Sequence, residues 1–172
     1  MLLPRGSGGG VSIIFPRPFY QMGISGVQRS QPGQNWMING QLVYALPSHY
    51  AGRNVPDVSA NADPETGYVV YYTSSTTGFA PEPFWGGTSF VAPQLNGVAS
   101  LLNQVFRGRI GMLNAPLYAL AMRGQAYHGS HPPLRAIRNG DNWFYHGRNG
   151  YSPAAGLGTL DVANLARVLG DE

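Results

Sequence analysis

A glycine turn leads directly into an apolar helical pattern near the middle of the chain, and a serine lies where the two meet. The turn at residues 86–89 reads GGTS. Beyond it, apolar residues recur at spacings of four, three and four, at Val91, Leu95, Val98 and Leu102. These spacings predict a buried helix from Phe90 to about Phe106. Pro93 would lie in its first turn, and Thr88 or Ser89 would cap it.

A serine at the start of a helix can act as a nucleophile. Free backbone N–H groups and the positive end of the helix dipole converge there, so an oxyanion formed by an attacking hydroxyl would be stabilised. An unassisted serine hydroxyl is nevertheless a weak nucleophile, and it needs a base that is itself held in place. The local pattern therefore leaves two interpretations open: a nucleophile, or an ordinary capped helix after a glycine turn.

Further motifs occur in a fixed order on both sides of Ser89. They are SGGGVS at 7–12 with FPRP and YQ shortly after it, VPDVSANADP at 55–64, LNAPLY at 113–118 and GLGT at 156–159. Together with the GGTSFVAP segment they resemble the sedolisins, the serine-carboxyl peptidases of the subtilisin-like superfamily. The resemblance spans nearly the whole chain and corresponds to the C-terminal, nucleophile-bearing part of the catalytic domain.

The resemblance implies a subtilisin-like α/β fold, in which layers of helices flank a mostly parallel sheet. Only the C-terminal portion of that fold would be present here. Residues 1–10 are interpreted as a flexible glycine-rich lead or a cloning remnant, and residues 11–172 as the C-terminal part of the peptidase domain.

The resemblance also implies that Ser89 is the nucleophile of a serine endopeptidase that forms an acyl-enzyme at acidic pH. In sedolisins the base is a glutamate backed by an aspartate, and a further aspartate serves the oxyanion site. These positions precede the glycines at 8–10, so we expect an N-terminal part of the peptidase domain, which this chain lacks, to supply them as a partner. This chain alone is then expected to be inactive towards its peptide or protein substrate.

Carboxylates and histidines within the chain are weak substitutes for the missing base. We interpret Asp57 as structural, with its carboxylate capping nearby backbone N–H groups. Glu82 lies between two prolines and is expected to be solvated. The four histidines, at positions 49, 128, 131 and 146, lie in loop-like sequence and are expected to be exposed.

A calcium site is typical of sedolisins near this end of the domain, with two aspartates and several backbone carbonyls as ligands. By the resemblance, Ala136 and Ser152 occupy the two aspartate positions, while Ile137, Arg148 and Gly150 could still offer carbonyls. Because calcium favours six to eight oxygens including carboxylates, we expect that this degenerate site binds no metal and that the chain has no cofactor. Asp141 is an alternative ligand. We expect the aromatic run at 143–145 to hold the loop by packing.

Composition narrows the possible partners. The formal net charge is +3, and all eleven basic residues are arginines scattered along the chain, a pattern that gives no support to nucleic-acid binding. No apolar run is long enough to span a bilayer, so no membrane partner is expected. The chain contains no cysteine, which excludes disulfides. It shows no signal peptide, although the family resemblance favours a secreted or extracytoplasmic protein.

Periodicity and turn residues predict the remaining elements. Strands are expected at 11–15, at 41–46 and, in a buried position, at 68–72. Short helices are expected from Asn114 to Leu120, with Asn114 as its cap, and from Asp161 to Leu169. Residues 128–149 are expected to form one long loop.

Two classes of function remain after the sequence is considered. The first is a serine endopeptidase fragment of sedolisin type that uses Ser89. The second is a non-catalytic sedolisin-like domain that binds peptides or a partner protein, which the missing base and the altered calcium positions favour. A Ser–His esterase is a weaker third alternative, because none of the histidines lies in a helix.

Overall fold

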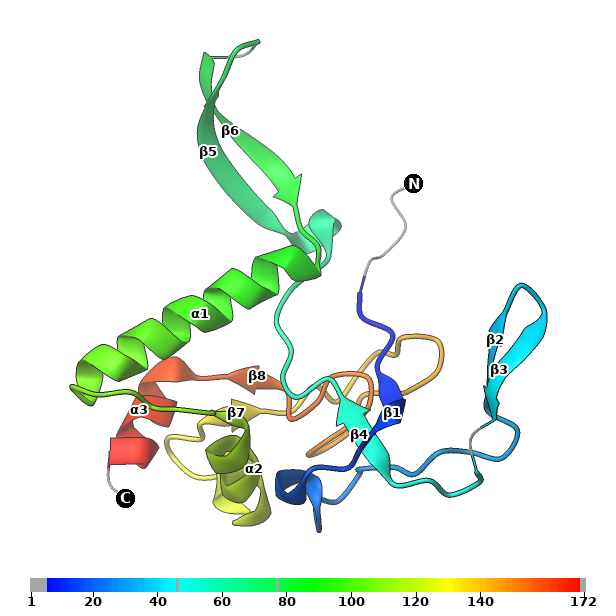
Figure 1. Cartoon of the computed structure of the whole chain (residues 1–172). Coiled ribbons are helices and arrows are strands. Elements are labelled where there is room, and N and C mark those ends of the chain that lie inside the picture. Colours follow the sequence, from blue (N-terminus) through cyan, green and yellow to red (C-terminus); the bar gives the residue numbers. More distant parts are fainter. Residues whose placement is uncertain (1–5, 46, 77, 171–172) are drawn as a thin grey trace. The chain divides into compact units, whose positions relative to one another are not determined.

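The computed structural model describes residues 6–45, 47–76 and 78–170, and its helices and strands belong to two units (Figure 1). The first unit is built around Ser59–Ile110, and the second from Gly8–Val58 together with residues from 111 onward. Among the described residues, no helix is both long and apolar enough to cross a membrane. Ser89 lies in the first unit, and the residues of the degenerate calcium site lie in the second.

The first unit begins with a short 3-10 helix, η2 (Pro64–Thr66), followed by a hairpin of β5 (Tyr68–Ser74) and β6 (Gly78–Trp85). The two strands are antiparallel, with Tyr68 opposite Trp85. Aromatic and β-branched residues explain the strand, but its predicted burial is wrong, since the side chain of Tyr71 is 64% exposed. A hairpin of two strands leaves both of its faces exposed unless another element packs against them.

Helix α1 (Thr88–Val105) follows the hairpin directly and begins two residues before the predicted start. Its predicted burial is wrong, because Leu102 is the one residue of the helix that is buried in the described chain. Its cap is Gly87, with no side-chain hydrogen bond, so the predicted capping by Thr88 or Ser89 is wrong. Gly87 has φ 106° and ψ 159°, a conformation that a residue with a Cβ adopts only with strain. Because the helix starts earlier, Pro93 lies in its second turn rather than its first.

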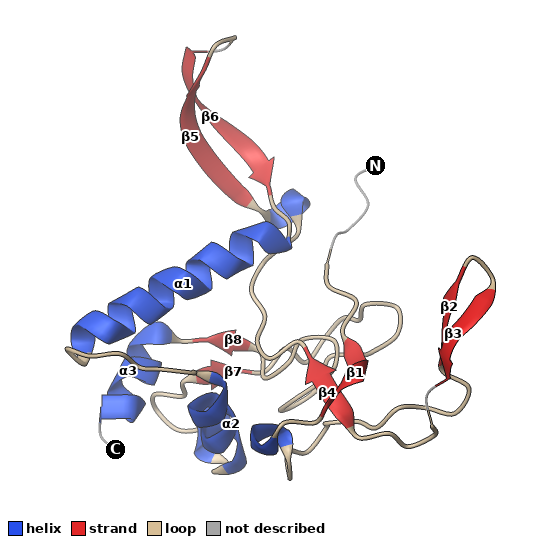
Figure 2. Ribbon diagram, in the orientation of Figure 1, coloured by secondary structure: helices blue, strands red, loops and turns tan. Residues whose placement is uncertain are grey.

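The described residues of the second unit form three antiparallel strand pairs. They are β1 (Gly10–Pro16) with β4 (Gly52–Val55), β2 (Asn35–Ile38) with β3 (Gln41–Ala45), and β7 (Leu134–Arg135) with β8 (Thr159–Leu160). The strands predicted at 11–15 and 41–46 are confirmed, although Leu46 lies outside the described residues. The mostly parallel sheet is not seen: every strand pair in the described part of the chain is antiparallel and two-stranded (Figure 2).

Helices pack the second unit around a core of large side chains. They are η1 (Phe19–Gln21), α2 (Asn114–Met122), η3 (Gln125–Tyr127) and α3 (Val162–Gly170). The fully buried side chains include Tyr118, Leu134, Tyr151, Leu157 and Leu165. The predicted cap of α2 is wrong, because Leu113 precedes the helix and Asn114 is already helical. The predicted helix at 161–169 is confirmed, and β7 interrupts the region predicted as one loop.

Candidate functional site

The Gly86–Gly87 turn fixes the approach to Ser89 by close backbone contacts within the first unit. The Gly87 N–H donates to the carbonyl of Ala62 at 2.6 Å. A Cβ built on Gly86 would lie 2.6 Å from the nitrogen of Pro64 and 2.8 Å from the oxygen of Ala62. Such contacts exclude any larger residue, so glycine at position 86 lets the turn lie against this segment.

Ser89 is the second residue of α1 and is exposed. The carbonyl of Gly87 accepts from the N–H of Phe90 at 3.0 Å. No described residue accepts from the N–H groups of Thr88 and Ser89, as expected in the first turn of a helix without a capping side chain. These two donors can therefore bind an anion or a developing oxyanion beside the Ser89 hydroxyl.

Pro93 adds a second irregularity next to the serine. In an α-helix the N–H of residue 93 would donate to the carbonyl of residue 89, and proline has no such donor. The carbonyl of Ser89 therefore has no α-helical partner, although α1 continues unbroken to Val105. Both the N–H and the carbonyl of Ser89 thus lack an α-helical hydrogen-bond partner.

An aromatic cluster secures the start of α1 to the hairpin. Phe90 stacks on Tyr68 with ring centroids 5.2 Å apart and planes 5° from parallel. The ring centroid of Trp85 lies 6.3 Å from that of Phe90 and 6.2 Å from that of Tyr72. The nearby Glu82 raises the pKa of Tyr72, and the side chain of Glu82 is half-buried. The cluster keeps Ser89 at a fixed place on its unit.

No base is paired with Ser89 among the described residues of the first unit. Within this unit no hydrogen bond joins its hydroxyl to a carboxylate, and the unit contains no histidine. In the first unit, the Asp63 carboxylate instead accepts from the N–H of Glu65 at 3.0 Å and caps η2. The histidines at 49, 128, 131 and 146 are all exposed, as predicted, and belong to the second unit.

Asp57 is structural, as predicted, but its partners are side chains rather than backbone N–H groups. Its Oδ1 accepts from the Tyr118 hydroxyl at 2.9 Å, and the guanidinium of Arg53 pairs with its Oδ2. Gln21 donates to the Tyr118 oxygen at 2.9 Å. Burial, and then the charge of Asp57, raise the pKa of Tyr118, so this hydroxyl stays protonated and keeps donating.

The residues at the degenerate calcium site do not fit the ion. Ser152 is 1% exposed, and its hydroxyl accepts from the Ala155 N–H at 3.2 Å. Its backbone N–H donates to Gly156 at 3.0 Å, and its carbonyl accepts from Gly156 at 2.7 Å. Ala136 has no side-chain oxygen. Ile137, Arg148 and Gly150 could offer only carbonyls, which leave the ion's double charge uncompensated.

Asp141 does not complete this set. Its Oδ1 accepts from the N–H of Trp143 at 3.0 Å, and its Oδ2 lies 3.9 Å from Nδ1 of His146. No three His, Cys, Asp or Glu side chains gather anywhere in the described ranges. The prediction that the aromatic run packs the loop is wrong for two of its members, because Trp143 is 84% and Phe144 77% exposed. Only Tyr145 turns inward, towards Gly10.

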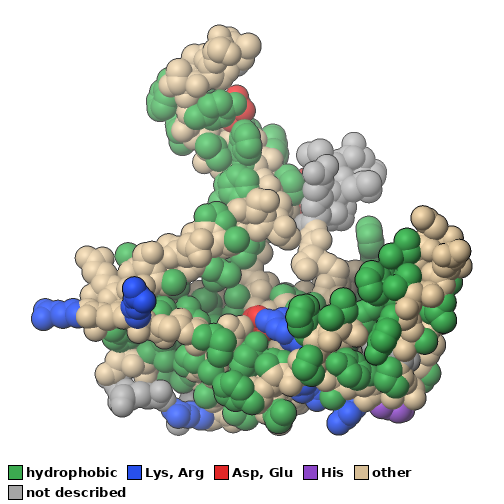
Figure 3. Space-filling model, viewed as in Figure 1, with side chains coloured by type: hydrophobic (Ala, Val, Ile, Leu, Met, Phe, Trp, Pro, Cys, Tyr) green, Lys and Arg blue, Asp and Glu red, His purple; other side chains and the backbone are tan. Residues whose placement is uncertain are grey.

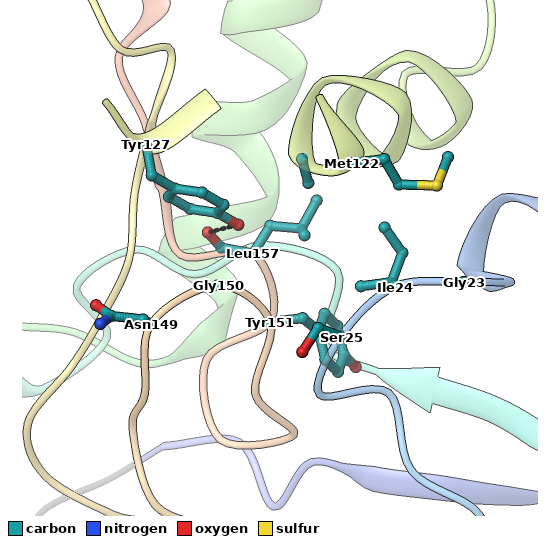
Figure 4. Close-up of a pocket in the computed structure, with 10 residues that line it drawn as sticks. Gly23, Ile24, Ser25, Met122, Tyr127, Asn149, Gly150, Tyr151 and Leu157 are labelled. Carbon is teal, nitrogen blue, oxygen red and sulfur yellow. Dashed lines mark hydrogen bonds between the residues drawn. The ribbon is translucent and has the colours of Figure 1, made fainter. Parts of the chain in front are cut away.

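One pocket of the second unit was not indicated by any motif (Figure 4). Its volume is about 340 Å³, and its lining combines small and apolar residues with two tyrosines, including Gly23, Ile24, Met122, Tyr127, Tyr151 and Leu157. The Tyr127 hydroxyl donates to the carbonyl of Leu157 at 3.1 Å, and burial raises the pKa of Tyr127 to about 12. Its polar side chains are those of Ser25, Asn149 and the two tyrosines, and no charged side chain lines it.

Comparison with known proteins finds relatives that match almost the whole of this chain. No family model matches the chain. It is 34% identical over 163 residues to kumamolisin from Bacillus sp. (strain MN-32), covering 95% of this chain and 25% of that protein. It is 32% identical over 173 residues to tripeptidyl-peptidase 1 of Homo sapiens, covering 95% of this chain and 27% of that protein. The chain thus spans about a quarter of the length of these curated relatives.

A solved structure also resembles the chain. It is Pseudomonas sedolisin, a serine-carboxyl proteinase, complexed with two molecules of pseudo-iodotyrostatin. The TM-score is 0.67 at 22% identity, over 96% of this chain and 37% of that one. At this identity the match shows the fold, which is of the α/β class.

Proposed function

The chain belongs to the sedolisin family, and from this premise we propose that it is the nucleophile-bearing part of a serine-carboxyl endopeptidase. The placement of Ser89 carries the proposal. Its hydroxyl is exposed at the start of α1, beside two N–H groups that no described residue occupies. A structural serine in a capped helix would instead use its hydroxyl to satisfy one of those donors.

The proposed reaction proceeds through an ester on Ser89. Its Oγ attacks the carbonyl carbon of the scissile peptide while its proton passes to a carboxylate base. The N–H groups at the start of α1 are the donors that this unit offers to the resulting oxyanion. Collapse of the tetrahedral intermediate expels the amine, which takes the proton back, and water then releases the acid from the ester. A carboxylate base places the activity at acidic pH.

We propose that an N-terminal part of the peptidase domain supplies this base and is the chain's partner. Exposed apolar side chains on both units support the partner (Figure 3). In the first unit, Tyr71, Phe79 and Phe84 are each more than 60% exposed, and in the second unit so are Ile14 and Phe15. Monomeric proteins rarely leave so many large apolar side chains uncovered. We further propose that the assembled protein binds no calcium and works in an extracytoplasmic compartment.

The second candidate is a non-catalytic domain that binds peptides or a partner protein. One observation favours it: no carboxylate or imidazole in the described residues contacts the Ser89 hydroxyl. The two candidates differ in whether an ester forms on this serine when the rest of the domain is present.

The test measures that ester. The chain is incubated with a chromogenic peptide ester at acidic pH, alone and after addition of the proposed N-terminal part of the domain (the upstream segment), and acylation is followed by mass spectrometry. We expect acylation only in the presence of the upstream segment, and its loss in Ser89→Ala. Ser100→Ala is the matched control, because Ser100 is also exposed in α1 and only donates to the Asn96 carbonyl at 2.9 Å.

Two outcomes would overturn the proposal. Binding of the upstream segment without any acylation, while peptides still bind the complex, would support the non-catalytic domain. Hydrolysis by the isolated chain at neutral pH, abolished by replacing one of the histidines, would support the esterase instead.

A further inference from the structure

A second pocket of the second unit has a volume of about 400 Å³ and shares no residue with the pocket of Figure 4. Its wall is built from the end of α2, the helix η3, the loop that leads to β7 and the last turn of α3. The wall combines a buried apolar part with an exposed basic part, a pairing that the pocket of Figure 4 does not have.

The apolar part of the wall belongs to the core of the second unit. Leu120 is 5% and Ala126 is 2% exposed, and Pro133 is also buried. Val168 of α3 joins them. An apolar group of a ligand is favoured here, because each CH₂ that leaves water gains transfer free energy. A small inorganic anion would leave this part of the wall without a contact.

The basic part of the wall consists of three exposed side chains. They belong to Arg123, His128 and His131, and no carboxylate lines the pocket in the described chain. No hydrogen bond or ion pair engages the imidazoles of His128 and His131 among the described residues. Both histidines therefore remain available to an anion.

The neighbouring elements add no described carboxylate that could neutralise these histidines. Asp161, which precedes α3, pairs with Arg135 of β7 at 3.1 Å. Arg167 of α3 is itself a cation. In η3, Tyr127 donates its hydroxyl to a backbone carbonyl at 3.1 Å, and burial raises its pKa to about 12, so it is neutral. The surroundings of the pocket thus favour a negative ligand.

We propose that this pocket binds an apolar group that ends in a carboxylate. The basic side chains would pair with the carboxylate, and the buried residues would cover the apolar group behind it. A peptide C-terminus with an apolar last residue and a free carboxylic acid both have this chemistry. A metal ion fits less well, because the wall offers it two imidazoles beside a guanidinium and no carboxylate.

The proposal predicts tighter binding in acid. Histidine is the side chain that changes its charge between about pH 5 and pH 8, so the pocket gains positive charge as the pH falls. The α-carboxylate of a peptide keeps its negative charge down to about pH 3.5. This inference concerns binding in the second unit and does not depend on the role of Ser89.

The experiment is titration calorimetry of the full chain with an acetylated tripeptide that ends in leucine. We expect the free acid to bind about tenfold more tightly than the C-terminal amide at about pH 5, and this difference to shrink towards about pH 8. At about pH 6, isocaproate should bind about tenfold more tightly than acetate or inorganic phosphate, because only isocaproate carries a leucine-like tail.

The double variant His128→Gln, His131→Gln should bind the free acid about tenfold more weakly and lose the pH dependence. His49→Gln is the matched control, because His49 is exposed in the same unit and does not line the pocket. Tighter binding of the tripeptide than of isocaproate would support the proposal with a peptide C-terminus as the ligand. The reverse order would support it with a free carboxylic acid.

Three outcomes would overturn the proposal. The first is equal binding of the free acid and the amide, and the second is unchanged binding in the double histidine variant. The third concerns Asp171 and Glu172, which lie outside the described residues. Binding seen only in Asp171→Asn with Glu172→Gln would mean that carboxylates of this chain compete for the pocket, so that it takes no external ligand.

Discussion

The turn before α1 and the turn closed by Ser152 both place a serine among glycines, yet they leave it in opposite states. Ser89 is exposed, with two free backbone donors beside it and no partner for its hydroxyl among the described residues. Ser152 is 1% exposed, and its hydroxyl, N–H and carbonyl are all bonded within its own turn. A serine whose hydroxyl and backbone groups are all hydrogen-bonded within its turn has no group available for a reaction. Where the hydroxyl and nearby N–H groups are unbonded, a substrate or the rest of the domain can bind to them.

The start of α3 extends the comparison. There Asp161 accepts from the N–H of Asn164 at 3.1 Å through its side chain, and from Leu165 at 2.8 Å through its carbonyl. The chain thus caps α3 with a carboxylate side chain, which occupies a donor of the first turn. At α1 it uses glycine instead, which leaves the first-turn donors available.

Replacing Gly86 with alanine should have the largest effect. The new Cβ would lie within 2.8 Å of the backbone of Ala62 and Pro64, so the turn must move. We expect a loss of about 1–3 kcal/mol in the free energy of unfolding. With the upstream segment present, we expect about a hundredfold slower acylation of Ser89. Urea unfolding and acylation rates measure the two effects.

Gly97→Ala is the control for that substitution. Gly97 lies in the same helix, and nothing is within 4 Å of the position of its Cβ. Alanine there should stabilise the chain by about 0.5–1 kcal/mol and leave acylation unchanged. Equal effects of the two substitutions would show that the close approach of Gly86 to the Ala62–Pro64 segment has no role in placing the serine.

Alanine at Ser152 should lower the stability of the protein, whereas alanine at Ser89 should abolish its acylation. Ser152→Ala removes the hydroxyl, which is one of two acceptors of the Ala155 N–H; the other is the Ser152 carbonyl at 3.2 Å. We expect a loss of about 0.5–1 kcal/mol in the free energy of unfolding. Ser89→Ala removes an exposed hydroxyl, so we expect a change below about 0.5 kcal/mol and no acylation. Thermal or urea unfolding of both variants checks this. Similar destabilisation by the two substitutions would mean that the Ser89 hydroxyl is structurally engaged.

Local sequence patterns predicted what depends on local chemistry. The apolar spacing predicted α1, and together with the glycine turn and the order of the family-like motifs it led to the prediction of Ser89 as the nucleophile. The capping of α1 was mispredicted, because a hydroxyl that can cap does so only if the preceding backbone permits it, and Gly87 takes that position in a left-handed conformation. Sequence preference for Ser or Thr at a cap carries no information on that choice.

Features set by distant contacts could not be predicted. One partner of Asp57, the hydroxyl of Tyr118, lies 61 residues away in sequence. The aromatic run at 143–145 was expected to pack inward because aromatic residues usually do. Its direction was set instead by the turn, which projects Trp143 and Phe144 and turns only Tyr145 towards Gly10. The pairing of strands likewise depends on neighbours that periodicity does not identify.

The capped start of α3 should make a small, pH-dependent contribution. The hydrogen bond from the Asn164 backbone, and then Arg135, hold the pKa of Asp161 below its ordinary value of 3.8. A depressed pKa in the folded state means stability that is present above pH 3.8 and is lost as the pH falls through the folded pKa. Asp161→Asn keeps a capping oxygen without the charge. The Tm difference between the two proteins should therefore shrink towards zero in strong acid, and a difference independent of pH would contradict this.

Calcium should leave the thermal stability of the protein unchanged, because the Ser152 turn is closed by its own hydrogen bonds. A ligand that binds only the folded state would stabilise it by about 2.7 kcal/mol at a hundredfold excess over Kd. At this site one family aspartate position holds Ala136, which has no side-chain oxygen, and the other holds Ser152, whose hydroxyl is already bonded. The turn is complete without an ion, so no stabilising term is left for one to supply. Melting curves in excess chelator and in millimolar calcium should coincide. A rise in Tm with calcium that disappears in Asp141→Asn would show that this carboxylate leaves the Trp143 N–H to bind the ion, and that the second turn is not closed after all.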